Sequence, residues 1–299
     1  MANPTFEGTI TAIITPFVAT GIKNDIDYES LRALVELQNK YVNGIVPCGT
    51  TGESPTLDHS EHNRVIEFVI ENSKVPVIAG TGSNCTYEAI EMSRHAVDAG
   101  AAATLQVCPY YNKPNQEGMF RHFGTIAGQV DAPQILYNIP GRAGKAIEAK
   151  TMARLAREYS NIIGVKEATG KPESWKQIRE ECGANFIILS GNDEDTFSMM
   201  RDYGGRGVIS VASNIIPERI RKFTDYGLAG RFEEMGREND ALANLFKGMF
   251  VDTNPIPVKH AAHLMGLTQS LGFRLPICET SRENIEKIRE MLRSYRLIG

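Results

Sequence analysis

Lys166 is the residue with the clearest chemical potential in this sequence, because it closes a short apolar run. Ile162, Ile163 and Val165 precede it, and a Glu-Ala-Thr-Gly turn follows at 167–170. A run this short, bounded by a turn, is typical of a fully buried parallel strand. Lysine is rarely buried without a partner, since desolvating an ammonium group is costly. The pattern therefore leaves three alternatives for Lys166. It is held in a salt bridge, it extends out of the strand end towards Glu167 or water, or it takes part in chemistry.

The chemistry open to such a lysine is nucleophilic attack on a carbonyl group. Roughly one ordinary lysine amine in a thousand is unprotonated at neutral pH. A dry, apolar site favours the neutral amine, which can attack a carbonyl carbon and form a Schiff base. Lys166 is therefore a candidate catalytic residue.

Tyr137 ends the preceding apolar run, at 134–137, and Arg142 lies on the loop beyond it, in the sequence LYNIPGR. A phenol can relay protons, and a guanidinium group can bind a carboxylate through two hydrogen bonds. The pair is thus suited to proton transfer and carboxylate binding. The alternative is a half-buried tyrosine and an unrelated surface arginine.

The segment Gly49-Thr-Thr-Gly-Glu-Ser54 also follows an apolar run and offers backbone N–H groups and the hydroxyls of Thr50 and Thr51 to an anion. It lacks the lysine of nucleotide-binding loops, which favours a small carboxylate over a triphosphate. The alternative is a tight turn that caps a helix.

Tyr110 and Tyr111 lie in a loop bounded by Pro109 and Pro114. Adjacent side chains tend to diverge, so the two tyrosines can serve different sites. Packing at an interface is the alternative.

The elements that must position these residues alternate along the chain. Eight short apolar runs predict strands at 9–14, 44–47, 75–79, 103–108, 134–137, 162–166, 186–189 and 208–211. Amphipathic stretches between and after them predict helices at 27–41, 58–73, 86–99, 116–130, 148–159, 172–182, 193–203 and 216–228. Eight such units favour an α/β fold, a closed (β/α)8 TIM barrel, in which residues just after the strands form the active site. The alternative, a doubly wound sheet, lacks its GxGxxG fingerprint here.

The strand pattern stops near residue 228, and helices are predicted at 229–250, 255–266 and 281–295. We therefore predict a barrel over 1–228 and a C-terminal all-helical region over 229–299. A region this small is expected to pack on the barrel or on another subunit.

Composition excludes several classes of function. The chain has 299 residues, 42% hydrophobic content and a net charge of −4, with no long basic run, so neither nucleic acid nor membrane is expected as a partner. Residues 1–6 lack a basic segment followed by an apolar one, and no stretch reaches the ~20 apolar residues of a membrane span. The cysteines are an odd number without a CxxC pair, which favours reduced thiols, a cytoplasmic location and no structural zinc; they are Cys48, Cys85, Cys108, Cys182 and Cys278.

Several motifs together carry a family resemblance. The chain resembles the dihydrodipicolinate synthase/N-acetylneuraminate lyase family in GTTGES at 49–54, PYYNKP at 109–114, LYNIPGR at 136–142, GVKEATG at 164–170, SGND at 190–193 and GVISV at 207–211. The motifs occur in order over nearly the whole chain. Arg142 and the Lys-Glu-Ala-Thr sequence at 166–169 separate it from the sialic-acid lyases of that family.

The resemblance implies roles for the residues singled out above. Lys166 would form a Schiff base with pyruvate, and Tyr137 would shuttle protons through Thr50 and a Tyr111 from the neighbouring subunit. Thr51 and the main chain near Ile209 would hold the pyruvate carboxylate. Arg142 would bind the carboxyl group of L-aspartate 4-semialdehyde. The resemblance also implies no metal or organic cofactor, and a homotetramer built as a dimer of dimers.

A second set of residues resembles the family's site for inhibition by L-lysine: Ser54, His59, His62, Asn84, Glu88 and Tyr110. The histidines are three apart, and Asn84 and Glu88 four apart, so each pair can share a helix face. Glu88 would then bind the inhibitor's ammonium group. The alternatives are a solvated helix face or a metal site, and HxxH lacks the spacing of the HExxH zinc motif.

Three functions remain open on this pattern. The first is condensation of pyruvate with the semialdehyde in lysine biosynthesis through diaminopimelate. The second is cleavage of N-acetylneuraminate or a keto-deoxy sugar acid, which uses Lys166 and Tyr137 but does not predict Arg142. The third is a barrel that binds pyruvate-like ligands without turnover.

Overall fold

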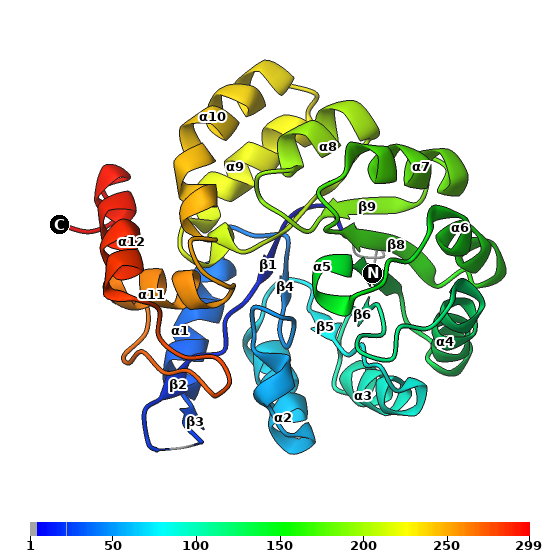
Figure 1. The fold of residues 1–299 in the computed structure, drawn as a ribbon, viewed down its shortest axis with the longest axis horizontal. Coiled ribbons are helices and arrows are strands. Elements are labelled where there is room, and N and C mark those ends of the chain that lie inside the picture. Colours follow the sequence, from blue (N-terminus) through cyan, green and yellow to red (C-terminus); the bar gives the residue numbers. More distant parts are fainter. Residues whose placement is uncertain (1–4, 22) are drawn as a thin grey trace.

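The computed structural model describes residues 5–21 and 23–299, and these form a (β/α)8 barrel with additional C-terminal helices (Figure 1). Residues 1–4, part of the segment in which the sequence predicts no export signal, lie outside the described residues. The predicted fold class is therefore confirmed.

Eight parallel strands make the barrel, and each overlaps a predicted run. In sequence order they are β1 (Gly8–Ala12), β4 (Gly44–Val46), β5 (Ile78–Gly80), β6 (Ala103–Val107), β7 (Gln134–Asn138), β8 (Ile162–Glu167), β9 (Ile187–Ser190) and β10 (Gly207–Ser210). Neighbours in the sheet follow the order β4-β1-β10-β9-β8-β7-β6-β5.

The two ends of this sheet meet between β4 and β5. The backbone N–H of Ile45 donates to the carbonyl of Pro76 at 3.0 Å, and Gly80 donates to Pro47 at 3.1 Å. A parallel bridge joins Ile45 to Val77. The barrel is thus closed, and the doubly wound alternative is wrong. The predicted strand at 75–79 begins too early, because Pro76 lacks the N–H that a regular ladder requires.

Helices surround the barrel at the predicted places. They are α1 (Tyr28–Gln38), α2 (His59–Asn72), α3 (Thr86–Asp98), α4 (Gln116–Gln129), α6 (Ala149–Glu158), α7 (Pro172–Cys182), α8 (Thr196–Tyr203) and α9 (Pro217–Leu228). Residues 193–195, predicted as helical, precede α8 and form a turn, and Asp193 belongs to the site described below. Within the described residues, none of these helices has both the length and the apolar character to span a membrane.

The C-terminal residues form α10 (Phe232–Gly248), α11 (Ile256–Leu264) and α12 (Arg282–Ser294). In Figure 1 they extend from α9 along one side of the barrel, with α11 packed against α12. The division of the chain at residue 228 remains a prediction, because α10 packs directly against α9 and no gap separates the two regions there.

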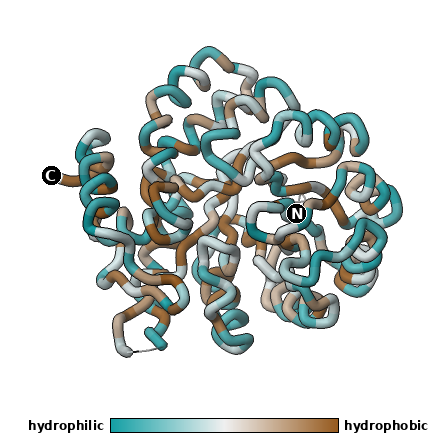
Figure 2. The backbone as a smooth tube through the Cα atoms, viewed as in Figure 1, coloured by the Kyte–Doolittle hydropathy of each residue, from teal (hydrophilic) through white to brown (hydrophobic). Residues whose placement is uncertain are grey.

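The apolar residues lie where the barrel architecture requires them. Figure 2 shows that hydrophobic residues concentrate along the central strands and hydrophilic residues on the outer helices. Side chains inside the barrel include Ile10, Leu105, Ile135, Leu189 and Ile209. A larger apolar layer joins the strands to the helices, and Trp175 of α7 is buried in it against Tyr203.

Five short elements within residues 5–21 and 23–299 have no counterpart in the sequence prediction. They are the antiparallel pair β2 (Phe17–Val18) and β3 (Asp25–Ile26), the helix α5 (Pro140–Ala143), and the 3-10 turns η1 (Ser54–Thr56) and η2 (Ala212–Asn214). Each is too short to have a detectable hydrophobic period. Three of them, α5, η1 and η2, directly follow strand ends or their loops, so they shape the mouth of the barrel.

Candidate active site

Lys166 and Tyr137 are neighbours on adjacent strands. They are paired in the register between β7 and β8, so both side chains point to the same face of the sheet. Tyr137 belongs to the apolar cluster inside the barrel. Lys166 is 6% exposed, and its Nζ lies 4.3 Å from the centroid of the Tyr137 ring. The barrel interior thus holds an amine beside a phenol, as the sequence predicted.

Lys166 is not the last residue of its strand, and the predicted turn at 167 is wrong. Glu167 continues β8 because it pairs with Asn138 of β7. Its carboxylate is fully buried and accepts hydrogen bonds from Asn138 Nδ2 at 2.8 Å and Thr169 N at 2.9 Å. Burial raises the pKa of Glu167, and these bonds partly oppose the increase. Successive strand residues point to opposite faces, so the alternative in which Lys166 extends towards Glu167 is wrong.

The Gly49–Ser54 turn follows β4 and is held by contacts on several sides. Thr51 is buried, and its Oγ1 accepts a hydrogen bond from Asn254 Nδ2 at 3.0 Å. The carbonyl of Gly52 accepts from Thr15 Oγ1 at 2.7 Å. A Cβ on Gly52 would lie 3.0 Å from the backbone nitrogen of Cys48 and 3.2 Å from the carbonyl of Ile13, so a larger residue would force the surrounding backbone to shift.

Glu53, in the same turn, has a left-handed backbone with φ of 53°. This conformation is unfavourable for a residue with a Cβ and needs support from its surroundings. A buried ion pair with Lys259 of α11 supplies that support. The Lys259 ammonium also lies 4.3 Å from the ring centroid of Phe17 and 5.0 Å from that of Phe273. Burial lowers the pKa of Lys259 to about 8, although the Glu53 carboxylate opposes this, so the ammonium form predominates at pH 7.

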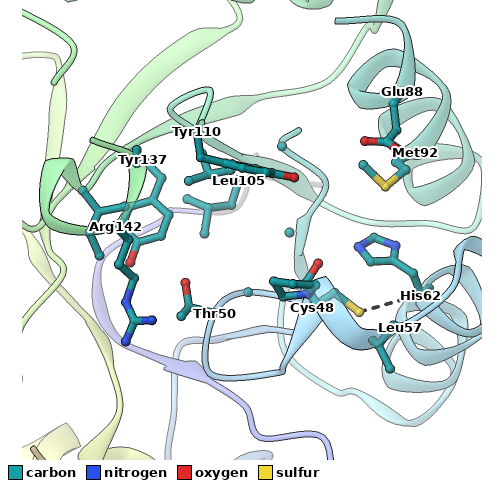
Figure 3. Close-up of a pocket in the computed structure, with 18 of the residues that line it drawn as sticks. Cys48, Thr50, Leu57, His62, Glu88, Met92, Leu105, Tyr110, Tyr137 and Arg142 are labelled. Atoms are coloured by element: carbon teal, nitrogen blue, oxygen red, sulfur yellow. Dashed lines mark hydrogen bonds between the residues drawn. The ribbon is translucent and has the colours of Figure 1, made fainter. Parts of the chain in front are cut away.

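A cavity of about 410 Å³ opens beside the turn (Figure 3). Thr50, Tyr137 and Arg142 lie at one end, and His62, Glu88 and Met92 at the other, with Cys48 and Tyr110 between them. Lys166, Thr51 and Ile209 are not among the residues lining this cavity, and Lys166 adjoins it through the ring of Tyr137.

Arg142 projects from α5, directly after β7. Its side chain is exposed, and Nη2 donates a hydrogen bond to the carbonyl of Asn254 at 3.0 Å. The short helix therefore places a guanidinium group at the cavity, where it can bind an incoming carboxylate.

Ile209 lies in β10, opposite Ile10 of β1. The backbone just beyond it is held by Asp193, a buried carboxylate that accepts hydrogen bonds from Ser210 Oγ at 2.5 Å and from the N–H groups of Val211 and Ala212 at 3.0 Å. Burial raises the pKa of Asp193, and these bonds together with the positive charge of Lys166 partly oppose the increase. Asp193 thus lies close enough to Lys166 for the two groups to interact electrostatically.

The two adjacent tyrosines diverge. Tyr110 lines the cavity, whereas Tyr111 is 91% exposed and has φ of 69°. Tyr111 therefore does not reach Tyr137 or Thr50 of its own chain. An exposed aromatic ring of this size is suited to contact another protein surface.

Part of the second predicted set of residues, His59, His62 and Glu88, lines the far end of the cavity. His59 Nε2 lies 2.8 Å from Glu88 Oε1, and Ser83 Oγ donates to the other carboxylate oxygen. These hydrogen bonds, first that from Ser83, lower the pKa of Glu88. Ser54 also lines the cavity. The carboxylate is therefore ionised at neutral pH and available to a cationic ligand.

His62 is buried, which contradicts the alternative of a solvated helix face for this residue. Neither ring nitrogen has a hydrogen-bond partner within the described part of the chain, and burial lowers the pKa of His62 to about 4. The neutral ring faces the cavity beside Met92 and Glu88 (Figure 3).

Asn84 does not share a helix face with Glu88, so that prediction is wrong. The helix α3 begins at Thr86 after the N-cap Cys85, which leaves Asn84 in the preceding loop. There its Nδ2 donates to the carbonyl of Tyr110 at 3.1 Å, and Asn112 Nδ2 donates to the carbonyl of Asn84 at 2.8 Å. Asn84 thus fixes the loop that carries the two tyrosines.

Sequence reasoning missed the residues that reach the site from the C-terminal region, namely Asn254 and Lys259, and it gave no role to Glu53 or Asp193. The available signal was polar residues in apolar surroundings: Asn254 begins the segment Asn-Pro-Ile-Pro and Lys259 follows Val258. Buried polar residues of this kind need partners, but the sequence does not say which.

Comparison with known proteins agrees with this geometry. The model of the dihydrodipicolinate synthetase family matches residues 5–295. The 4-hydroxy-tetrahydrodipicolinate synthase of Citrifermentans bemidjiense is 47% identical over 297 residues, which cover 98% of this chain and 100% of the relative.

Solved structures give the same result. The chain superposes on dihydrodipicolinate synthase from Aquifex aeolicus with a TM-score of 0.94 at 44% identity, covering 98% and 99% of the two chains. A chloride-inhibited dihydrodipicolinate synthase from Acinetobacter baumannii, complexed with pyruvate, gives 0.94 at 41% identity, covering 98% and 100%. The enzyme from Cyanidioschyzon merolae with lysine bound gives 0.92 at 38% identity, covering 98% and 99%.

Proposed function

The chain belongs to the dihydrodipicolinate synthetase family, and from this premise we propose that it joins pyruvate to L-aspartate 4-semialdehyde through an imine on Lys166. The observation that carries the proposal is the buried Lys166 amine, 4.3 Å from the Tyr137 ring inside the barrel. The activity is that of a 4-hydroxy-tetrahydrodipicolinate synthase, a lyase of the diaminopimelate route to lysine. The names of the matched relatives favour this reaction over the cleavage of sialic acid or keto-deoxy sugar acids.

The first half of the reaction activates pyruvate. The neutral Lys166 amine attacks the C2 carbonyl, water leaves, and a protonated imine forms. The positive imine nitrogen then accepts electron density when C3 loses a proton, which gives an enamine. Asp193 supports the positive charge on the nitrogen, and Tyr137 moves protons to and from the reacting atoms. Thr51 and the backbone near Ile209 hold the carboxylate.

The second half uses the aldehyde. The enamine carbon attacks the C4 carbonyl of the semialdehyde, whose carboxyl group binds Arg142. The amine of the new chain then attacks the imine carbon, which closes the ring and releases Lys166. In this scheme the protonated imine is the electron sink, and the reaction requires no metal or organic cofactor.

Thr50 links Tyr137 to the proton relay, and the partner subunit's Tyr111 completes it. Two observations support a shared relay: Tyr111 is almost fully exposed on its own chain, and Thr50 lines the cavity beside Tyr137. A reciprocal exchange of this kind needs at least a dimer, and a homotetramer of two such dimers is the predicted assembly. The cytoplasmic location stays a prediction of the cysteine pattern.

A coupled assay tests the reaction. We expect turnover with pyruvate and L-aspartate 4-semialdehyde and none with N-acetylneuraminate in the reverse direction. Turnover of N-acetylneuraminate alone would contradict the proposal. Pyruvate binding without turnover of either substrate would identify a binding protein instead.

Arg142→Ala is expected to lower kcat/KM for the semialdehyde by about 10- to 100-fold, the effect of one charged hydrogen-bonded contact. The pyruvate imine should still form, since Arg142 takes no part in it, and borohydride trapping would check this. Arg201→Ala, which removes an exposed arginine paired with Asp202 on α8, is the matched control. It should change neither kcat/KM for the semialdehyde nor the yield of the trapped pyruvate adduct. Unaltered semialdehyde kinetics in Arg142→Ala would remove the assigned role.

L-Lysine is proposed to inhibit by binding at the far end of the cavity, with its ammonium group on Glu88. Free L-lysine should lower initial rates, and Glu88→Gln should raise the half-inhibitory concentration by about tenfold or more. Glu91→Gln, on the exposed side of the same helix, is the control. Initial rates that do not change at saturating lysine would end this site assignment.

A further inference from the structure

Asn254 touches both residues proposed to hold the substrates' carboxylates. Its Nδ2 donates to Thr51 Oγ1 at 3.0 Å, and its main-chain carbonyl accepts from Arg142 Nη2 at 3.0 Å. Thr51 follows β4 and Arg142 follows β7, whereas Asn254 precedes α11 in the C-terminal helical region. One residue of the C-terminal helical region thus contacts two separate loops of the barrel.

The hydrogen bond from Asn254 limits the direction in which the Thr51 hydroxyl can donate its own hydrogen. A hydroxyl group has one hydrogen to donate and two lone pairs with which to accept. Since Asn254 presents an N–H to Thr51 Oγ1, the Thr51 hydrogen cannot point back along that bond. It is left to donate elsewhere. A carboxylate is an acceptor only, so a threonine fixed in this way is ready to bind one.

The arrangement is buried, and the turn that carries Thr51 is tied to the same segment a second time. Asn254 is 7% exposed, and its Oδ1 is buried without a hydrogen-bond partner among the residues that the structure describes. Five residues later, Lys259 pairs with Glu53 at the other end of the Thr51 turn. The start of α11 therefore holds the turn at two points.

We propose that Asn254 is a positioning residue that orients the Thr51 hydroxyl as a hydrogen-bond donor to the pyruvate carboxylate and fixes Arg142 through its main-chain carbonyl. The inference rests on the proposed function, since it takes the roles of Thr51 and Arg142 from there. Asn254 itself acts through Thr51.

Two substitutions of Asn254 separate orientation from packing. Asn254→Ala removes the N–H donor and keeps the carbonyl that binds Arg142. It should raise the KM for pyruvate about fivefold, the factor for one neutral hydrogen bond, and change that for the semialdehyde less than twofold. Asn254→Asp has nearly the same shape but offers only acceptors, so the Thr51 hydroxyl turns towards it and a negative charge faces the substrate. Its KM for pyruvate should rise more than tenfold.

The chain supplies a matched control. Asn284 of α12 donates through Nδ2 to the hydroxyl of Thr280 at 3.0 Å, the same contact outside the barrel. Asn284→Asp should leave both KM values within twofold of the unaltered enzyme. Thr51→Val removes the hydroxyl that Asn254 orients, so adding Asn254→Ala to it should raise the pyruvate KM no further.

The outcomes are distinguishable. The inference is overturned if Asn254→Asp binds pyruvate as well as Asn254→Ala, if the effects of Asn254→Ala and Thr51→Val add, or if the variants change kcat and the melting temperature but neither KM. If Asn254→Asp does not fold, the double-mutant cycle of Asn254→Ala with Thr51→Val still tests whether Asn254 acts through Thr51. If the unaltered enzyme shows neither turnover nor a borohydride-trapped pyruvate adduct, the proposed function is wrong. If the unaltered enzyme turns over normally but the variants do not change the KM for pyruvate, only the positioning role of Asn254 is wrong.

Discussion

Lys166→Arg is expected to abolish the condensation, with kcat lowered by about 10³-fold or more. The guanidinium group keeps the positive charge and most of the length of lysine, but it does not lose its proton at any working pH and cannot attack a carbonyl. Charge beside Asp193 and the ring of Tyr137 is thus retained while the nucleophile is lost. Loss of activity in this variant would therefore report chemistry rather than electrostatics.

The measurement is reduction with borohydride in the presence of pyruvate, followed by peptide mass analysis. The unaltered enzyme should carry a pyruvate adduct on Lys166, and Lys166→Arg should carry none. Lys171→Arg, five residues on and outside the strand, is the control and should still be labelled at Lys166. An adduct of equal yield in Lys166→Arg would show that another amine forms the imine.

Lys259→Met is expected to lower the free energy of unfolding by about 3–5 kcal/mol, because it leaves the buried Glu53 carboxylate without its charged partner, with only a long hydrogen bond from the Arg274 N–H at 3.5 Å. Methionine has a similar length and suits the apolar walls provided by Phe17 and Phe273. The cost therefore comes from the unpaired charge, not from a cavity. Activity should fall as well, since Glu53 in its left-handed conformation closes the turn that carries Thr50 and Thr51.

Denaturant or thermal unfolding checks this prediction, and a second substitution isolates the cause. Adding Glu53→Gln to Lys259→Met removes the unpaired charge and should restore much of the stability. Lys222→Met, on an exposed part of α9, should change the stability by less than about 0.5 kcal/mol. A change below about 1 kcal/mol in Lys259→Met would mean that the pair contributes little.

The sequence predicted those parts of the molecule that depend on local pattern. Each barrel strand is a short apolar run because its two faces are buried, and a run of this kind is visible without knowledge of its neighbours. Lys166 and Tyr137 could be placed together because each stands near the end of a run, and consecutive βα units place consecutive strands side by side. Arg142 and the Thr50–Thr51 turn followed from the same reasoning.

What could not be predicted depends on contacts between residues far apart in the chain. Asn254 and Thr51 are 203 residues apart, and no period or motif relates them. The burial of Glu167 likewise depends on Asn138 of the neighbouring strand, so the sequence suggested a turn where the strand continues. Asn84 has helical spacing from Glu88, yet the cap at Cys85 excludes it from the helix.

The attachment of α11 to the barrel mouth limits how this scaffold can be recombined. Barrels of this architecture are often treated as interchangeable modules, in which loops or half-barrels are transplanted and peripheral helices are discarded. A minimal barrel ending at residue 228 would retain Lys166 and Tyr137, but Thr51 and Glu53 would lose Asn254 and Lys259. Chimeras should therefore carry the segment 254–259 together with the 49–54 turn, as a single unit of exchange.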